Sequence, residues 1–223
     1  SQNVFIKHML QYIRTHKDKP FFLFHSTQLP HGPVDIPEVH PDFVDDVRLS
    51  DVEKEYASMV KMLDDHVGLI MAELKRQKID KKTIVIFTSD NGHEIYYFQN
   101  KGRVRQRTHH GELDVFKGSM NLAGAKWTNW QGGIRVPLIA HWPGKIEAGS
   151  ISKRLTAAYD YLPTFAEAIG TKAPKGKDGE SFFSELIGKN KLATKRRYII
   201  VNDAIITDEW KFLYHQKKRW LFR

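Results

Sequence analysis

Apolar residues recur at helical spacing in two parts of the chain. In residues 3–16 they mark one helix, which ends before Pro20. From residue 52 to residue 74 they mark one face of a helix of about six turns. Residues 50–53 carry the serine and glutamate of a capping box, which predicts where this helix begins. We assign its apolar face to core packing.

Two short apolar runs predict strands before and after the long helix. Residues 21–24 and 83–88 are apolar almost throughout, as expected for strands that are buried on both faces. A strand, a long helix and a second strand at this spacing indicate a right-handed crossover in a parallel sheet. The predicted fold class is therefore α/β, with a mostly parallel central sheet flanked by helices.

The rest of the catalytic-sized domain contains shorter elements. We predict a strand at 138–141 that a Pro-Gly turn closes, an amphipathic helix at 158–169 that Gly170 ends, and a helical turn at 181–186. Residues 93–125 lack periodicity and are rich in glycine and basic residues. We expect this long irregular segment to form a wall of a substrate pocket.

The C-terminal residues predict a small antiparallel meander. Its three strand-like segments are residues 198–201, 210–214 and 219–222. We therefore predict an α/β domain over residues 1–188 and the start of a small antiparallel subdomain, probably cut short, over residues 189–223.

Composition excludes several classes of function. The chain has no cysteine, which excludes disulfides, thiolate metal sites and a cysteine nucleophile within these 223 residues. No apolar run approaches the roughly 20 residues that a membrane span needs. The chain starts at Ser1 rather than at a methionine, so we expect it to be an excised or processed piece.

Positive charge is concentrated near the C-terminus. The formal net charge is +9, and residues 189–223 hold ten lysines and arginines against three acids. One interpretation is a solvated basic surface, and the other is attraction of polyanions such as sulfated glycans or nucleic acid. Because no recognisable nucleic-acid module accompanies the charge, we predict no nucleic-acid partner.

Polar side chains follow the strand at 83–88 directly. Asp90 and Asn91 end this apolar run and precede Gly92, where a bend can make the two side chains converge. A carboxylate and an amide oxygen suit a hard cation such as Ca²⁺ or Mg²⁺. Asp-Asn-Gly is also a common turn sequence, and that alternative stays open.

Two further residues lie where they can serve the same site. Lys126 follows Gly124 in a glycine-rich loop, and a lysine beside backbone donors suits a tetrahedral oxyanion. His31 lies between Pro30 and Pro33 just after the predicted strand at 21–24. Each has an ordinary alternative, which is exposure to solvent on a surface loop.

These residues stand in motifs that resemble the type I, formylglycine-dependent sulfatases (arylsulfatases) of the alkaline phosphatase superfamily. The motifs are Thr88-Ser89-Asp90-Asn91-Gly92, Leu29-Pro30-His31-x-Pro33, and Gly124-x-Lys126-x-x-x-Trp130-x-Gly132-Gly133-x-Arg135-Val136-Pro137. The segment Trp210-Lys211-Phe212-Leu213-Tyr214 is similar to a C-terminal strand of that family. The resemblance covers essentially the whole chain.

The resemblance implies a role for each candidate. Asp90 and Asn91 would be ligands of a divalent metal, normally calcium, and Lys126 would bind the sulfate. His31 would protonate the departing alcohol. His93, which follows the strand end, and Arg135 are weaker candidates for substrate contact. Arg135 is more simply explained as bracing the Gly-Gly loop through a buried ion pair.

The resemblance also implies parts that these residues do not contain. The family nucleophile is a formylglycine made from Cys or Ser in a Cys/Ser-x-Pro/Ala-x-Arg motif, and no such motif occurs here. We therefore expect the carboxy-terminal portion of a sulfatase that by itself does not hydrolyse sulfate esters. The family implies a periplasmic or secreted location and a sulfated carbohydrate or other sulfate ester as partner. Nothing in the sequence indicates the oligomeric state.

Two alternatives to a sulfatase remain at this point. A phosphodiesterase or phosphonate hydrolase of the same superfamily would keep the fold and change the reaction. A non-catalytic glycan-binding protein on a truncated sulfatase fold would explain the basic C-terminal residues and the missing nucleophile.

Overall fold

A computed structural model describes residues 2–95, 114–189, 196–215 and 217–223 of the chain. The chain divides into two compact units. The first comprises residues 1–83 and 94–107, and the second comprises residues 84–93 and 108–223. Each unit is described by itself.

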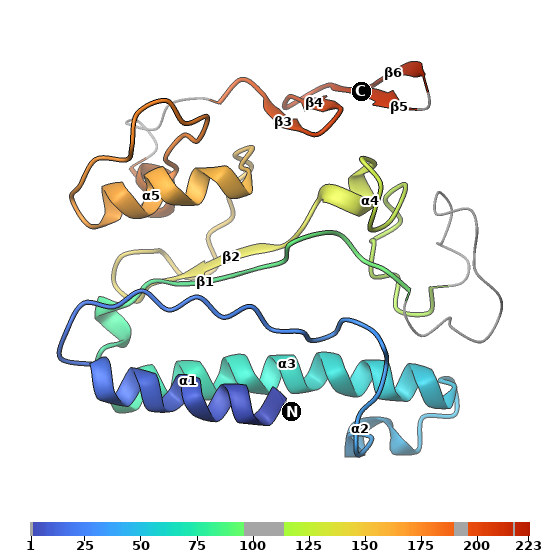
Figure 1. Cartoon of the computed structure of the whole chain (residues 1–223), viewed down its shortest axis with the longest axis vertical. Helices are drawn as coiled ribbons and strands as arrows, with labels where there is room; N and C mark the ends of the chain where they lie inside the picture. The colour runs from blue at the N-terminus through green and yellow to red at the C-terminus, as the bar shows by residue number, and fades with distance from the viewer. Residues whose placement is uncertain (1, 96–113, 190–195, 216) are drawn as a thin grey trace. The chain divides into compact units, whose positions relative to one another are not determined.

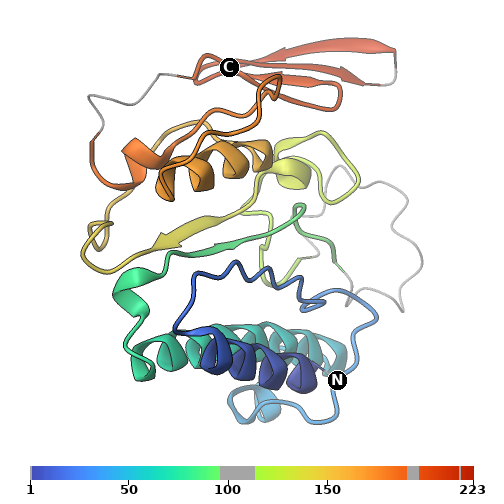
Figure 2. The same cartoon turned by 60° about the vertical axis from the view of Figure 1, so that its left-hand side comes forward.

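Two helices dominate the first unit, and both were predicted. Helix α1 (Gln2–His16) and helix α3 (Asp51–Arg76) lie side by side (Figures 1 and 2). The predicted capping box at Ser50 and Glu53 is present at the start of α3. A short helix, α2 (Pro41–Val44), precedes α3, and a 3₁₀ turn, η1 (Asp80–Lys82), follows it.

The two long helices pack through an apolar seam and a buried carboxylate. Ile6, Met9 and Ile13 of α1 are buried at spacings of three and four residues, as expected for one helical face. Glu73 of α3 is also buried, and Arg14 of α1 donates to its Oε2 at 3.0 Å. This hydrogen bond lowers the pKa of Glu73 to about 2.

The strand predicted at residues 21–24 is not formed. These residues are extended but belong to no β-ladder in the described part of the chain. Their exposure alternates, with Phe22 72% and Phe24 79% exposed, so one face only is covered. The prediction of a strand buried on both faces is therefore wrong, and with it the crossover between this segment and residues 83–88. An apolar run gives β-propensity, but a strand also needs a paired neighbour.

A two-stranded ladder lies at the start of the second unit. Strand β1 (Val85–Thr88) pairs antiparallel with β2 (Leu138–His141), and Thr88 lies opposite Leu138. All four residues of β1 are half-buried rather than buried. The Thr88 hydroxyl donates to the Pro137 carbonyl at 2.9 Å, which extends the contact past the end of the ladder. Asp90 and Asn91 follow β1 directly.

The C-terminal residues form the predicted meander with one strand more than expected. Strands β3 (Ile199–Val201), β4 (Ala204–Ile206), β5 (Lys211–His215) and β6 (Lys218–Phe222) pair antiparallel in sequence order. Figures 1 and 2 show them as the red sheet. The missed strand, β4, is three residues long and follows a two-residue turn at Asn202, whose φ is +48°.

Three predicted helical segments are also present in the second unit. Helix α5 (Tyr161–Ala168) follows a 3₁₀ turn, η3 (Ala158–Asp160), and Gly170 ends it with a φ of +73°. The other two are α6 (Phe183–Leu186) and the single turn α4 (Gln131–Ile134), which carries the Gly-Gly pair.

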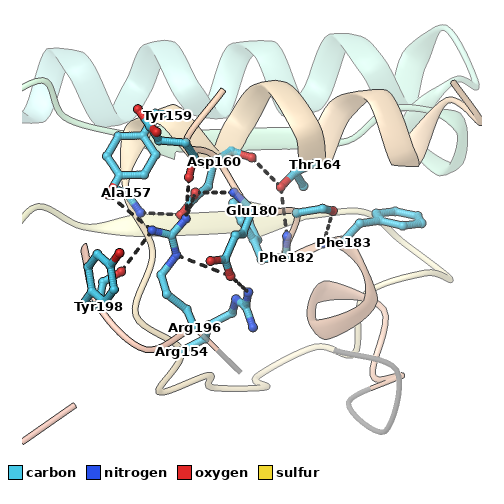
Figure 3. Close-up of polar contacts among 12 residues, drawn as sticks. Arg154, Ala157, Tyr159, Asp160, Thr164, Glu180, Phe182, Phe183, Arg196 and Tyr198 are labelled. Atoms are coloured by element: carbon cyan, nitrogen blue, oxygen red, sulfur yellow. Dashed lines mark hydrogen bonds and ion pairs between the residues drawn. The ribbon is translucent and has the colours of Figure 1, made fainter. Parts of the chain in front are cut away.

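A buried ion pair joins α5 to the start of the meander (Figure 3). The Arg196 guanidinium pairs with Asp160, and the two side chains are 4% and 1% exposed. Asp160 also accepts hydrogen bonds from the backbone N–H groups of Ala157, at 2.8 Å, and Glu180, at 2.9 Å. The carboxylate is thus satisfied from three directions, as a buried charge requires.

Candidate functional site

The end of β1 presents two oxygen-bearing side chains. Asp90 is exposed and Asn91 is half-buried. The Ser89 hydroxyl donates to the Asn91 carbonyl at 3.0 Å, and the Asn91 amide nitrogen donates to the Gly92 carbonyl at 2.9 Å. With its nitrogen used in this bond, the Asn91 side chain offers its oxygen as the ligand atom.

Glycines allow the glycine-rich loop to cross the strand end at very short range. The Gly92 N–H donates to the Gly133 carbonyl at 2.8 Å. A Cβ on Gly92 would lie 1.9 Å from the Gly132 oxygen, and a Cβ on Gly132 would lie 2.1 Å from the Gly124 oxygen. Because no side chain fits at this crossing, glycine is required at these positions.

Lys126 lies in the same loop and is buried, with 9% of its surface exposed. Its backbone N–H donates to the His93 carbonyl at 2.9 Å, so the lysine is attached directly to the segment that carries Asp90 and Asn91. The side-chain ammonium lies 5.2 Å from the centre of the Trp127 ring, a cation–π contact. The structure thus brings together three of the predicted site residues.

Trp127 marks this turn as strained. Its φ is +74°, a conformation that bulky side chains rarely adopt, and its side chain is 74% exposed. The turn is held by Thr128, whose N–H and hydroxyl both donate to the Ala125 carbonyl, at 3.1 and 2.8 Å. Strain of this kind persists only where surrounding contacts fix the backbone.

The strand end suits a hard cation in chemistry but supplies only part of a ligand shell. Asp90 and Asn91 offer oxygen atoms, which Ca²⁺ and Mg²⁺ prefer. Among the described residues, no group of three or more His, Cys, Asp or Glu side chains could hold a metal ion. Since calcium takes about six to eight oxygen ligands, these residues fit calcium in kind and need further ligands to complete the shell.

His93 is engaged by a residue that the sequence analysis did not identify. Its Nε2 lies 3.2 Å from a carboxylate oxygen of Asp114, which is buried. Asp114 also accepts the N–H groups of Phe116 at 3.0 Å and Gly118 at 2.7 Å. A Cβ on Gly118 would lie 2.6 Å from His93 Nδ1. The ring is therefore packed against residues 114–118, and no local pattern in that irregular segment singled out Asp114.

Arg135 does not make the predicted buried ion pair. It directly follows α4 and is exposed, although its N–H donates to the Gln131 carbonyl at 2.8 Å. The Gly-Gly loop is instead held by backbone hydrogen bonds, including one from Gly132 N to the Ala123 carbonyl at 2.8 Å. Substrate contact by Arg135 remains a prediction.

His31 belongs to the first unit and is exposed. Its Nδ1 lies 2.7 Å from the Gly32 carbonyl oxygen, and its N–H donates to the Gln28 carbonyl at 2.7 Å. Because a carbonyl can only accept, Nδ1 carries the hydrogen, and Nε2 is the nitrogen that takes the second proton. The expected pocket wall in residues 93–125 lies largely outside the described residues.

The comparisons with known proteins agree on one family. The Sulfatase family model matches residues 1–171. The chain is 32% identical over 176 residues to N-acetylgalactosamine-6-sulfatase of Rattus norvegicus, covering 78% of this chain and 30% of that protein. It is 28% identical over 210 residues to N-acetylgalactosamine-6-O-sulfatase of Bacteroides thetaiotaomicron, covering 91% and 38%.

Solved structures show the same fold. A sulfatase structure concerned with the metabolism of multiple glycosaminoglycans by Bacteroides thetaiotaomicron aligns with a TM-score of 0.76 at 23% identity, covering 99% of this chain and 48% of that one. The crystal structure of Ps i-CgsB with k-i-k-neocarrahexaose aligns with a TM-score of 0.75 at 22% identity, with the same coverage. The chain thus spans less than half the length of these relatives. The predicted α/β class of the alkaline phosphatase-like fold is confirmed, and by its match to the family model over most of its length the chain belongs to the sulfatase family.

Proposed function

We propose that the whole protein hydrolyses sulfate esters of a carbohydrate, and that this chain supplies part of its active site. One observation carries the proposal: buried Lys126 sits in a loop whose backbone is hydrogen-bonded to the strand end that presents Asp90 and Asn91. An ammonium beside two cation ligands suits a sulfuryl group. Two of the relatives are named as N-acetylgalactosamine 6-sulfatases, which favours a sulfated sugar as substrate.

Each residue has a distinct part in the proposed reaction. The Lys126 ammonium binds the sulfuryl oxygens and stabilises the charge on them in the transition state. His31, protonated on Nε2, gives that proton to the departing alcohol oxygen. Asp90 and Asn91 would hold Ca²⁺, which when bound neutralises charge on the sulfuryl oxygens and orients them. The formylglycine nucleophile that the resemblance implies would come from outside these 223 residues.

Calorimetry of the chain with inorganic sulfate, with and without calcium, tests the anion site. We expect sulfate to bind, calcium to strengthen the binding, and Lys126→Ala to abolish it. Lys145→Ala is the matched control, because it removes the same charge from an exposed position in the same unit. Equal sulfate affinity in Lys126→Ala and Lys145→Ala would refute the assignment of Lys126.

The lack of a nucleophile motif supports a second candidate for the chain by itself. A protein with the anion site and without Cys/Ser-x-Pro/Ala-x-Arg would bind sulfated glycans and leave them intact, and the basic residues 189–223 favour such binding. Assays with 4-methylumbelliferyl sulfate separate the two. Turnover above a Lys126→Ala control would refute the expectation that this chain is inactive alone.

A further inference from the structure

We propose that Lys211 is a positioning residue that holds the loop carrying Lys126 in its anion-binding conformation. The loop comprises residues 123–133, and its centre rests on the C-terminal sheet. The Lys211 Nζ donates to the Asn129 carbonyl at 2.5 Å, across 82 positions in the sequence. The relevance of the loop to sulfate rests on the function proposed above, whereas the anchoring itself does not.

The place of Lys211 in the sheet is unusual for a lysine. It begins β5, an inner strand, where it pairs with Ile206 of β4 and Phe222 of β6. It is 6% exposed and shares a face of the strand with Leu213, which is fully buried. Burial lowers the pKa of its ammonium to about 8.

Stability does not explain a lysine at this position. Its hydrogen-bond acceptor is a neutral carbonyl, which only partly offsets the loss of hydration of a buried ammonium. A methionine of similar length would fill the same space without that cost. What the lysine adds is a directed donor that fixes one carbonyl of the loop.

Two neighbouring contacts hold the same point of the loop. The Asn202 side-chain nitrogen donates to the Asn129 side-chain oxygen at 3.0 Å. The Trp130 ring packs edge-on against Trp220 and Phe222 of β6, with ring centres 6.1 and 5.2 Å apart. The middle of the loop is thus attached to β5 and β6 and to the turn before β4.

The anchored carbonyl is close in sequence to the anion-binding lysine. Asn129 follows the Ala125–Thr128 turn, which contains Lys126 and holds Trp127 at positive φ. On its other side the loop binds the strand end, through Lys126 N to the His93 carbonyl. The loop is therefore clamped between the strand end and the sheet, and releasing Asn129 loosens the turn that aims Lys126.

The test compares Lys211→Met with Lys218→Met in the full chain. Lys218 lies on β6 and is exposed, so it is the matched control. We measure urea unfolding, hydrogen exchange of the Lys126 and Gly132 amides, and affinity for inorganic sulfate. For Lys211→Met we expect an unchanged or higher urea midpoint, loop exchange faster by at least about fivefold, and sulfate affinity lower by a similar factor. Lys218→Met should match wild type in all three.

Each contrary result has a definite meaning. Unchanged exchange of the loop amides in Lys211→Met would overturn the proposal. So would a lowered urea midpoint with exchange accelerated equally at Tyr214 of β5, because that pattern marks a residue that only stabilises the sheet. If wild type binds no sulfate but Lys211→Met still loosens the loop, the anchoring stands and the proposed function fails.

Discussion

Replacing Gly92 by alanine tests the close crossing on which the candidate site depends. The added Cβ would lie 1.9 Å from the Gly132 oxygen and 2.7 Å from the Gly132 carbonyl carbon. Ordinary contact begins at 3.4 Å, so the two backbones must separate by about 1.5 Å. Both clashing atoms are backbone atoms, so no side-chain rotation can relieve them.

That separation has two costs. It stretches the hydrogen bond from Gly92 N to the Gly133 carbonyl, now 2.8 Å, beyond hydrogen-bonding range. Leaving buried backbone groups unpaired costs about 1–3 kcal/mol. Overpacking costs about 1–3 kcal/mol more. We therefore expect Gly92→Ala to lower the free energy of unfolding by about 2–6 kcal/mol.

Tryptophan fluorescence during urea unfolding measures this loss directly. All five tryptophans lie in the second unit, so the signal reports the unit that contains the crossing. The matched control is Gly68→Ala in α3, where an added Cβ meets nothing within 4 Å. Far-UV circular dichroism should show Gly68→Ala stabilised by about 0.5–1 kcal/mol, since alanine is the better helix former. A Gly92→Ala variant within about 0.5 kcal/mol of wild type would refute the argued crossing.

Three other substitutions test the charged contacts. The hydrogen bond from Arg14 lowers the pKa of Glu73 to about 2 from 4.5, so the stability it provides is complete above pH 4.5 and is lost as the pH falls towards 2; urea unfolding followed by circular dichroism should show a weaker acid dependence in Glu73→Gln. Asp160→Asn leaves buried Arg196 without its carboxylate and should cost about 3–5 kcal/mol, part of which Arg196→Met recovers in the double variant; no recovery would contradict the pair. Asp114→Ala removes the acceptor of two backbone N–H groups and should lower the fluorescence midpoint by about 1–3 kcal/mol.

The elements that the sequence predicted correctly are those that depend on local signals. Helix α3 has its capping box and its apolar face within one continuous segment, and the meander strands have their turns beside them. Residues 21–24 have a β-like pattern that the alternating exposure of Phe22 and Phe24 confirms. The pattern could not show whether another strand lies beside them, because pairing depends on residues far away in the chain.

The candidate site divides in the same way. Asp90, Asn91 and Lys126 are recognisable because their residue types and glycine neighbours are local and specific. Asp114 and Lys211 act through contacts with segments that are remote in sequence, and a buried lysine cannot be told from an exposed one by its neighbours. Arg135 shows the reverse error, since its motif suggested a buried brace and it is exposed.

The way the site is held together bears on how it would bind an anion. The strand end and the loop are joined by backbone hydrogen bonds, from Gly92 N to the Gly133 carbonyl and from Lys126 N to the His93 carbonyl. These bonds form on folding of the second unit, before any ligand is present. An anion that meets Lys126 therefore finds a donor whose backbone is already ordered, so little conformational entropy is lost on binding there. The same reasoning makes Lys211 important, because a loop fixed only at the strand end would have to be ordered by the ligand itself.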